Sequence, residues 1–271
     1  MFKLARVCCF LLVAMPLAGC FKIPDLRQIY ILSGNAANDT GDFEAADVAY
    51  SRAIRLAPKH AAVYVYRAIA RTATGKYNAA VEDCSEAIRL DPALTMAYVC
   101  RGHARQFLQE YNAAVKDYSE AIRIDPKYLD AYIGRAGALV WKNEYDRAMK
   151  DLNEAVRLDP KSIEAFVRRG DHRQRLGDLT AAIDDYTEAI RLDSTHVNAY
   201  VERANAWTWK EDFDAAIQDY TEALRLDPSL AEVYVYRGGA RQHQQEFDAA
   251  VEDYSEAIRL DPKQVDAYLY R

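Results

Sequence analysis

The sequence repeats itself every 34 residues, and a recurring proline marks the phase of the repeat. The series is Pro58, Pro92, Pro126, Pro160, Ser194 in place of proline, Pro228 and Pro262. Nearly the same segment precedes each member, for example YNAAVEDCSEAIRLDP at 77–92 and FDAAVEDYSEAIRLDP at 247–262. A fixed period of this length indicates one supersecondary unit copied along a line, so the sequence predicts a solenoid rather than a globule.

Seven copies of the unit occupy residues 27–264 of the 271-residue chain. Length alone would suggest about two domains of roughly 150 residues. No linker rich in proline, serine or glycine separates the copies, however, so we expect one elongated domain. Residues 265–271 repeat the opening of the unit and predict the truncated first helix of an eighth copy.

Each unit contains two helical patterns when its residues are numbered 1 to 34, with the marker proline at position 32. Position 4 is aromatic and position 8 is Gly or Ala in all seven units, which places both on one face of a first helix. Positions 20 and 27 are always Ala and position 24 is usually Tyr, which predicts a second helix at close approach. Glycine or a polar residue at position 15 predicts the turn between them.

Small residues at positions 8, 20 and 27, aromatics at 4, 17 and 24 and proline at 32 closely resemble the tetratricopeptide repeat family. The resemblance covers all seven units. It implies an all-α fold of antiparallel helix pairs, stacked into a right-handed superhelical solenoid whose first helices line a concave groove. It also implies a protein that holds peptides or partner proteins, with no cofactor and usually no chemistry of its own.

An arginine and an aspartate recur together in six units, at positions 7 and 23, and both are absent from the first unit. If the antiparallel pair brings positions 4 and 27 together, and likewise 11 and 20, then 7 faces 23. We therefore expect an ion pair inside each hairpin, although solvated charges are the alternative. The expected pairs are Arg67–Asp83, Arg101–Asp117, Arg135–Asp151, Arg169–Asp185, Arg203–Asp219 and Arg237–Asp253.

By the same resemblance, positions 2, 5, 9, 12 and 13 line the groove. Position 5 is uniformly aliphatic, so the Lys/Asn pattern of the family's carboxylate clamp is missing. Aromatic residues with an arginine among them are typical interface anchors, and glutamines could bond a peptide backbone. The alternative is ordinary packing between repeats. The candidates are Phe107, Trp141, Arg175, Trp209 and His243 at position 13, with Gln106, Gln174 and Gln242 at position 12.

The first twenty residues combine Lys3 and Arg6 with an apolar run that is too short to span a bilayer. The run ends in LAGC at 17–20, which resembles the lipobox of bacterial lipoproteins. This resemblance implies a signal peptide over 1–19, a lipid on Cys20, a tether over 20–26 and, because Phe21 follows the cysteine, anchoring to the outer membrane facing the periplasm. The alternative is an ordinary signal peptide with an incidental cysteine.

Without residues 1–19 the chain carries 33 basic and 41 acidic residues, a net charge of −8. This charge argues against binding nucleic acid or anionic lipid headgroups. Cys84 and Cys100 remain, in a compartment that permits disulfides. Both alternatives stay open for them: a disulfide bridge, or two buried free thiols.

No familiar catalytic or metal-binding string occurs. Asp171 and His172 are neighbours on a helix and are expected to be surface groups. We therefore expect a membrane-anchored adaptor in the bacterial envelope, not an enzyme. Self-association without a separate client, for example at the C-terminal edge, is the alternative, and an accessory domain of an envelope enzyme complex is a weaker one.

Overall fold

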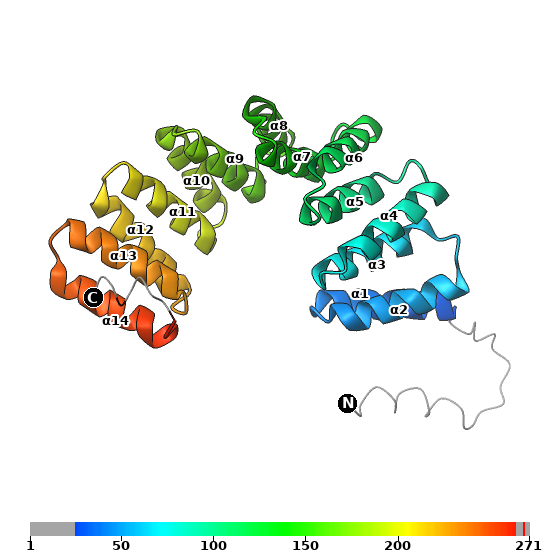
Figure 1. Cartoon of the computed structure of the whole chain (residues 1–271), viewed down its shortest axis with the longest axis horizontal. Helices are drawn as coiled ribbons and strands as arrows, with labels where there is room; N and C mark the ends of the chain where they lie inside the picture. Colours follow the sequence, from blue (N-terminus) through cyan, green and yellow to red (C-terminus); the bar gives the residue numbers. More distant parts are fainter. Residues whose placement is uncertain (1–24, 264–267, 269–271) are drawn as a thin grey trace, which may run out of the picture.

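The computed structural model describes residues 25–263 and residue 268. This part of the chain folds into fourteen α-helices and contains no strand. Figure 1 shows the helices following one another along an arch, with α1 at one end and α14 at the other. Their bounds are α1 Leu26–Asp39, α2 Phe43–Leu56, α3 Ala61–Ala73, α4 Tyr77–Leu90, α5 Thr95–Phe107, α6 Tyr111–Ile124, α7 Leu129–Trp141, α8 Tyr145–Leu158, α9 Ile163–Arg175, α10 Leu179–Leu192, α11 Val197–Trp209, α12 Phe213–Leu226, α13 Ala231–His243 and α14 Phe247–Leu260.

The repeat predicted from the sequence coincides with the helix pairs, so the all-α solenoid is confirmed. Odd-numbered helices cover roughly the first half of each unit and even-numbered helices the second. The only earlier start is at the N-terminal end, where α1 begins at Leu26 and the carboxylate of Asp25 accepts a bond from the Arg27 amide. The predicted signal peptide, Cys20, the tether up to residue 24 and the eighth-unit opening other than Tyr268 lie outside the described residues.

The turn inside each repeat requires a left-handed residue at position 15. Three repeats place glycine there, with φ of 76°, 75° and 81° at Gly41, Gly75 and Gly177. The other four place Gln109, Asn143, Glu211 and Gln245 there, with φ between 59° and 63°. Glycine adopts this conformation without a steric penalty from Cβ, and the polar residues adopt it at some cost. The turn is therefore the same in all seven repeats although the residue type at position 15 varies.

The marker proline lies in the turn between repeats, where its carbonyl group is used by the next repeat. The position-4 hydroxyls of Tyr64, Tyr98 and Tyr132 donate to the carbonyl oxygens of Pro58, Pro92 and Pro126 at 3.1 to 3.2 Å. Tyr200 makes the same bond to Ser194 at 3.4 Å. The bond needs only a carbonyl oxygen, so serine can replace proline at this point.

The core of each hairpin is a large residue at position 24 set against a small residue at position 8. A Cβ added to Gly170 would lie 2.6 Å from the Tyr186 ring, and the same clash occurs between Gly102 and Tyr118 at 2.8 Å. Repeat 4 has instead the smaller Leu152 at position 24 and accepts Ala136. Four of the five hairpins with tyrosine at position 24 have glycine at position 8, and repeat 6 is the exception, with Ala204 beside Tyr220.

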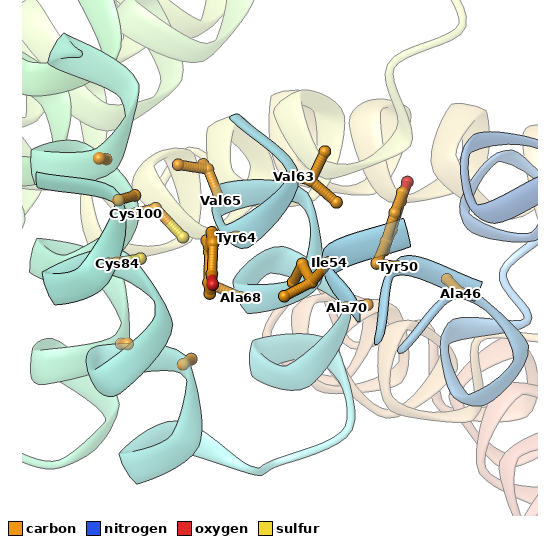
Figure 2. Close-up of a cluster of buried hydrophobic side chains, with 14 of the residues drawn as sticks. Ala46, Tyr50, Ile54, Val63, Tyr64, Val65, Ala68, Ala70, Cys84 and Cys100 are labelled. Carbon is orange, nitrogen blue, oxygen red and sulfur yellow. The ribbon is translucent and has the colours of Figure 1, made fainter. Parts of the chain in front are cut away.

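Repeat 2 has Cys84 at position 24, and its thiol lies beside Cys100 of the next repeat (Figure 2). Both cysteines are buried and both are free thiols. The hydrogen bond with Cys100, followed by burial, raises the pKa of the Cys84 thiol. Of the two states that the sequence left open, the structure contains the reduced pair packed into the apolar cluster of repeats 1 to 3.

The expected ion pair between positions 7 and 23 is present in all six repeats that carry it. Arg135, for example, donates from Nε and Nη2 to the two carboxylate oxygens of Asp151, both at 2.8 Å. The six aspartates are only 2% to 7% exposed. The pairs are thus buried and bidentate, and the alternative of solvated charges is wrong.

Each of these arginines also joins its repeat to the one before it. The remaining nitrogen, Nη1, donates at 3.0 to 3.2 Å to the position-25 side chain of the preceding repeat, as Arg135 does to Ser119. The guanidinium group also lies over the position-4 ring, 5.5 to 5.9 Å from its centroid. One side chain therefore links two helices of its own hairpin to the neighbouring repeat.

A second arginine, at position 11, shares the buried aspartate in four repeats. Arg71, Arg105, Arg173 and Arg241 donate from Nη1 to the same carboxylates at 2.6 to 2.8 Å. Sequence analysis missed this contact, although arginines four residues apart on one helical face were a visible signal. Repeats 4 and 6 have Leu139 and Trp207 at this position, so their aspartates have one arginine partner each.

His172 is buried, which corrects the expectation that it is a surface group. It occupies position 10, which is alanine in the other six repeats, and it is 3% exposed. Its Nε2 donates to the carbonyl oxygen of Tyr145 at 2.9 Å, while Nδ1 is buried without a partner. Burial lowers the pKa of His172 and so favours its neutral form. At this junction, α8 and α9 pack less tightly than the helices of any other junction in the described chain.

The bidentate pair of repeat 4 predicts a strong energetic coupling. Removing either Arg135 or Asp151 leaves the other charge buried and should cost about 3–5 kcal/mol of unfolding free energy. In a double-mutant cycle to alanine, measured by urea denaturation, the coupling should exceed about 1 kcal/mol. The matched control is the exposed Glu154–Arg157 pair on the same helix, for which we expect at most about 0.5 kcal/mol. Additive effects at Arg135 and Asp151 would contradict the prediction.

The volume matching of positions 8 and 24 predicts a destabilising mutation with a specific rescue. Gly170→Ala should cost about 1–3 kcal/mol, because the new methyl group overlaps the buried Tyr186 ring. Adding Tyr186→Leu reproduces the Ala136 and Leu152 pair of repeat 4. The double variant should therefore lose less unfolding free energy than the two single variants lose together. Thermal and urea unfolding of the four proteins test this, and strictly additive losses would show that the new methyl group and the Tyr186 ring do not clash.

Candidate peptide-binding groove

The first helices of successive repeats line a series of cavities on one side of the solenoid. A cavity of about 550 Å³ lies over α3 and α5, and one of about 590 Å³ over α5, α7 and the start of α9. Further along, a cavity of about 460 Å³ lies over α9 and α11, and one of about 690 Å³ over α11 and α13. We call this series the groove. Positions 5, 9, 12 and 13 line it repeatedly, as the sequence analysis expected.

The aromatic side chains at position 13 are the most exposed part of the groove. Phe107, Trp141 and Trp209 are 60%, 68% and 73% exposed, and each lines a cavity. Side chains of this size are usually buried, so three exposed ones within four consecutive repeats, with Arg175 between Trp141 and Trp209, define an unusual apolar surface.

Packing between repeats fixes one face of several position-13 rings. Phe107 stacks on Tyr77 at 4.8 Å between centroids, Trp141 on Tyr111 at 5.8 Å and His243 on Phe213 at 4.5 Å. In each pair the partner is the position-17 residue of the preceding repeat. The alternative of packing between repeats is therefore partly correct, but the high exposure of Phe107 and Trp141 leaves most of their surface available in the groove.

The position-12 glutamines are held by the buried tyrosines beneath them. The side-chain carbonyl oxygens of Gln106 and Gln242 accept bonds from the hydroxyls of Tyr118 and Tyr254, and that of Gln174 shares the single proton of the Tyr186 hydroxyl with Asp171. Their acceptor atoms are thus already engaged. Within the described chain, their Nε2 amides have no hydrogen-bond acceptor, so the glutamines present donors that suit peptide carbonyl oxygens.

The acidic side chains of the groove cluster around α9 and α11. Asp171 and Glu202 line the same cavity as Trp209 and Arg175. Burial, together with the nearby charge of Glu202, raises the pKa of Asp171 to about 6, although the Tyr186 hydroxyl donates to it at 3.0 Å. The side chain of Asp171 is still 38% exposed, so the expectation of a surface group is partly correct and Asp171 is half-buried. Its raised pKa had no sequence signal beyond the polar side chains at position 9 of other repeats, such as Asn35 and Asn205.

Among the residues that the structure describes, no cluster of three or more His, Cys, Asp or Glu side chains could hold a metal ion. None of the fourteen helices is both long and apolar enough to cross a membrane. The features that distinguish the groove are exposed aromatics, amide donors and a local group of carboxylates.

Helix pairs stacked along a groove of this composition define a helical-repeat scaffold of the kind that binds protein or peptide partners. Family models described as tetratricopeptide repeat match residues 31–94, 108–166, 163–196 and 197–230, and one described as TPR repeat matches 243–271. The chain belongs to the tetratricopeptide repeat family.

Solved structures of low sequence identity share the fold. The Cut9-Hcn1 hetero-tetramer of APC/C aligns with a TM-score of 0.72 at 17% identity over 90% of this chain, and this chain spans 48% of that one. The Pseudomonas aeruginosa pilF protein aligns with a TM-score of 0.67 at 18% identity, over 78% of this chain and 96% of its own. YrrB, described as a TPR protein with an unusual peptide-binding site, aligns with a TM-score of 0.57 at 20% identity, over 70% of this chain and 97% of its own. No curated protein matches the chain in sequence.

Proposed function

We propose that this protein is an adaptor that holds an extended segment of a protein partner in the groove. The observation that carries the proposal is the row of Phe107, Trp141 and Trp209, each more than half exposed inside a cavity. Aromatic side chains that become buried when a partner binds supply much of the binding energy in protein interfaces. The orientation of the position-12 glutamines by buried tyrosines adds amide donors in fixed positions, which reduces the entropy lost on binding.

We further propose that a lipid on Cys20 anchors the adaptor to the bacterial outer membrane, facing the periplasm. This proposal rests on the basic start, the short apolar run and the LAGC box. The five residues from Phe21 to Asp25, which precede α1, would reach at most about 18 Å if extended, so the groove would lie near the membrane surface.

Site-specific crosslinking in cells tests the adaptor. A photoreactive amino acid in place of Trp141 or Trp209 should capture the same partner, whereas one in place of Arg157, which is exposed on α8, should not. Trp141→Ala should also reduce the crosslink from position 209 by about 30-fold, since loss of a central anchor costs about 2 kcal/mol or more. Equal crosslinking from position 157, or no effect of Trp141→Ala, would contradict binding along the groove.

The lipid anchor is tested by a single substitution. Cys20→Ser removes the thiol to which the lipid would be attached, so the variant should remain unprocessed and should lose any lipid label supplied to the cells. A variant released by cleavage at another site should be found in the soluble fraction. Cys84→Ser is the control, because that cysteine is buried in the solenoid and should retain wild-type fractionation. A Cys20→Ser variant that is still processed and membrane-bound would show that the LAGC box is incidental.

Self-association is the second candidate function. The exposed apolar side chains of α14 favour it, since Phe247 and Val251 are 58% and 42% exposed. By contrast, Val115, which occupies the same position as Val251 in repeat 3, is only 9% exposed. Light scattering over a range of concentrations separates the candidates, because a concentration-independent monomer would exclude self-association as the function.

A further inference from the structure

The lining of the groove differs between repeats 2 to 4 and the cavity over α9 and α11. In repeats 2 to 4 the cavities are lined mainly by apolar and aromatic side chains, including Ile69, Met96, Val99, Phe107, Ile133 and Trp141, with one carboxylate in each, Asp130 and Glu164. The cavity over α9 and α11 has two carboxylates, Asp171 and Glu202, and a single aromatic side chain that is exposed, Trp209. A partner that follows the groove therefore meets two different chemistries.

Two of these carboxylates share the cavity over α9 and α11. Glu202 accepts a bond from the Asn205 amide at 3.3 Å and has no cationic partner among the described residues. The nearest cation to Asp171 is Arg168, whose Nη1 is 3.9 Å away and whose Nε is bonded to Glu164. Burial is the main cause that raises the pKa of Asp171 to about 6, and the charge of Glu202 adds to it.

The same cavity contains the indole ring of Trp209, which is 73% exposed. An aromatic face next to two carboxylates is well suited to a cationic side chain, which gains both ion pairing and a cation–π contact. Arg175 also lines this cavity, is exposed and forms no ion pair with a described carboxylate. It is the competing cation that the protein itself supplies.

We propose that the groove selects an extended partner segment with apolar side chains over repeats 2 to 4 and a lysine or arginine that enters the cavity of Asp171, Glu202 and Trp209. This inference rests on the proposed function and specifies the chemistry of its partner. Trp141 and Trp209 are two repeats apart, about 20 Å if successive first helices are about 10 Å apart. An extended chain covers this distance with about six residues, which sets the expected spacing between apolar anchor and basic side chain.

A random library of displayed 12-residue peptides, selected against the full-length chain, tests the proposal. The recovered sequences should carry Lys or Arg about six residues from an apolar or aromatic residue. The best peptide is then synthesised with a fluorescent label, together with a version in which the basic residue is replaced by glutamine. Its affinity for wild-type protein, measured by fluorescence anisotropy, should fall at least about 10-fold on this replacement.

Protein variants assign the preference to the cavity. Glu202→Gln should weaken the original peptide by about the same factor and make binding insensitive to the basic residue. Arg175→Gln should strengthen binding of the original peptide, because it removes the competing cation. Glu252→Gln, which removes an exposed carboxylate from α14 outside the cavities, is the matched control and should change nothing.

The outcomes separate this inference from the proposed function. If the peptides depend on Trp141 or Trp209 but carry no basic residue, or if Glu202→Gln and the peptide substitution have additive effects, the cation site is wrong and the groove still binds peptides. If no selected peptide depends on Trp141 or Trp209, groove binding fails, and the proposed function fails with it.

Discussion

The buried arginine–aspartate pair is the interaction on which the solenoid depends. A solenoid has no contacts between distant parts of the chain, so its stability comes from each hairpin and each junction. The position-7 arginine serves both, because it bonds the aspartate of its own second helix and the position-25 side chain of the preceding repeat. Breaking such a pair is costly, since the remaining charge stays buried. The pair therefore fixes the register within each hairpin and the stacking of consecutive hairpins.

The tyrosines at position 24 connect this framework to the groove. Their rings fill the hairpin against the small residue at position 8, which is glycine in four of these five repeats, and their hydroxyls reach side chains at positions 9 and 12. A change in the core is thus transmitted directly to groove residues such as Gln174 and Asp171. The polar lining of repeats 5 to 7 is held in place by core packing and does not depend on the groove side chains alone.

Repeat 5 differs from the others in both its framework and its groove. His172 replaces a small alanine at the junction with repeat 4, where the two helices are less tightly packed. The cavity that two carboxylates share, Asp171 and Glu202, begins at the same repeat. The packing of α8 and α9 sets the position of repeats 1 to 4 relative to repeats 5 to 7. The partner segment that we propose would cross this junction and contact both parts of the groove.

The sequence by itself determined the repeat, the helix pairs and the six ion pairs, because each of these follows from a period copied seven times. The positions that line the groove were implied by the resemblance to the tetratricopeptide repeat family. The sequence also marked Phe107, Trp141 and Trp209 as candidates. Only the tertiary structure decided the properties that depend on how the helices pack. These are the sharing of aspartates by a second arginine of the same hairpin, the stacking of Trp141 on the preceding repeat, the burial of His172 and the raised pKa of Asp171. The physical reason is that burial and electrostatic environment are set by atoms on other helices, whose approach only the packing geometry defines.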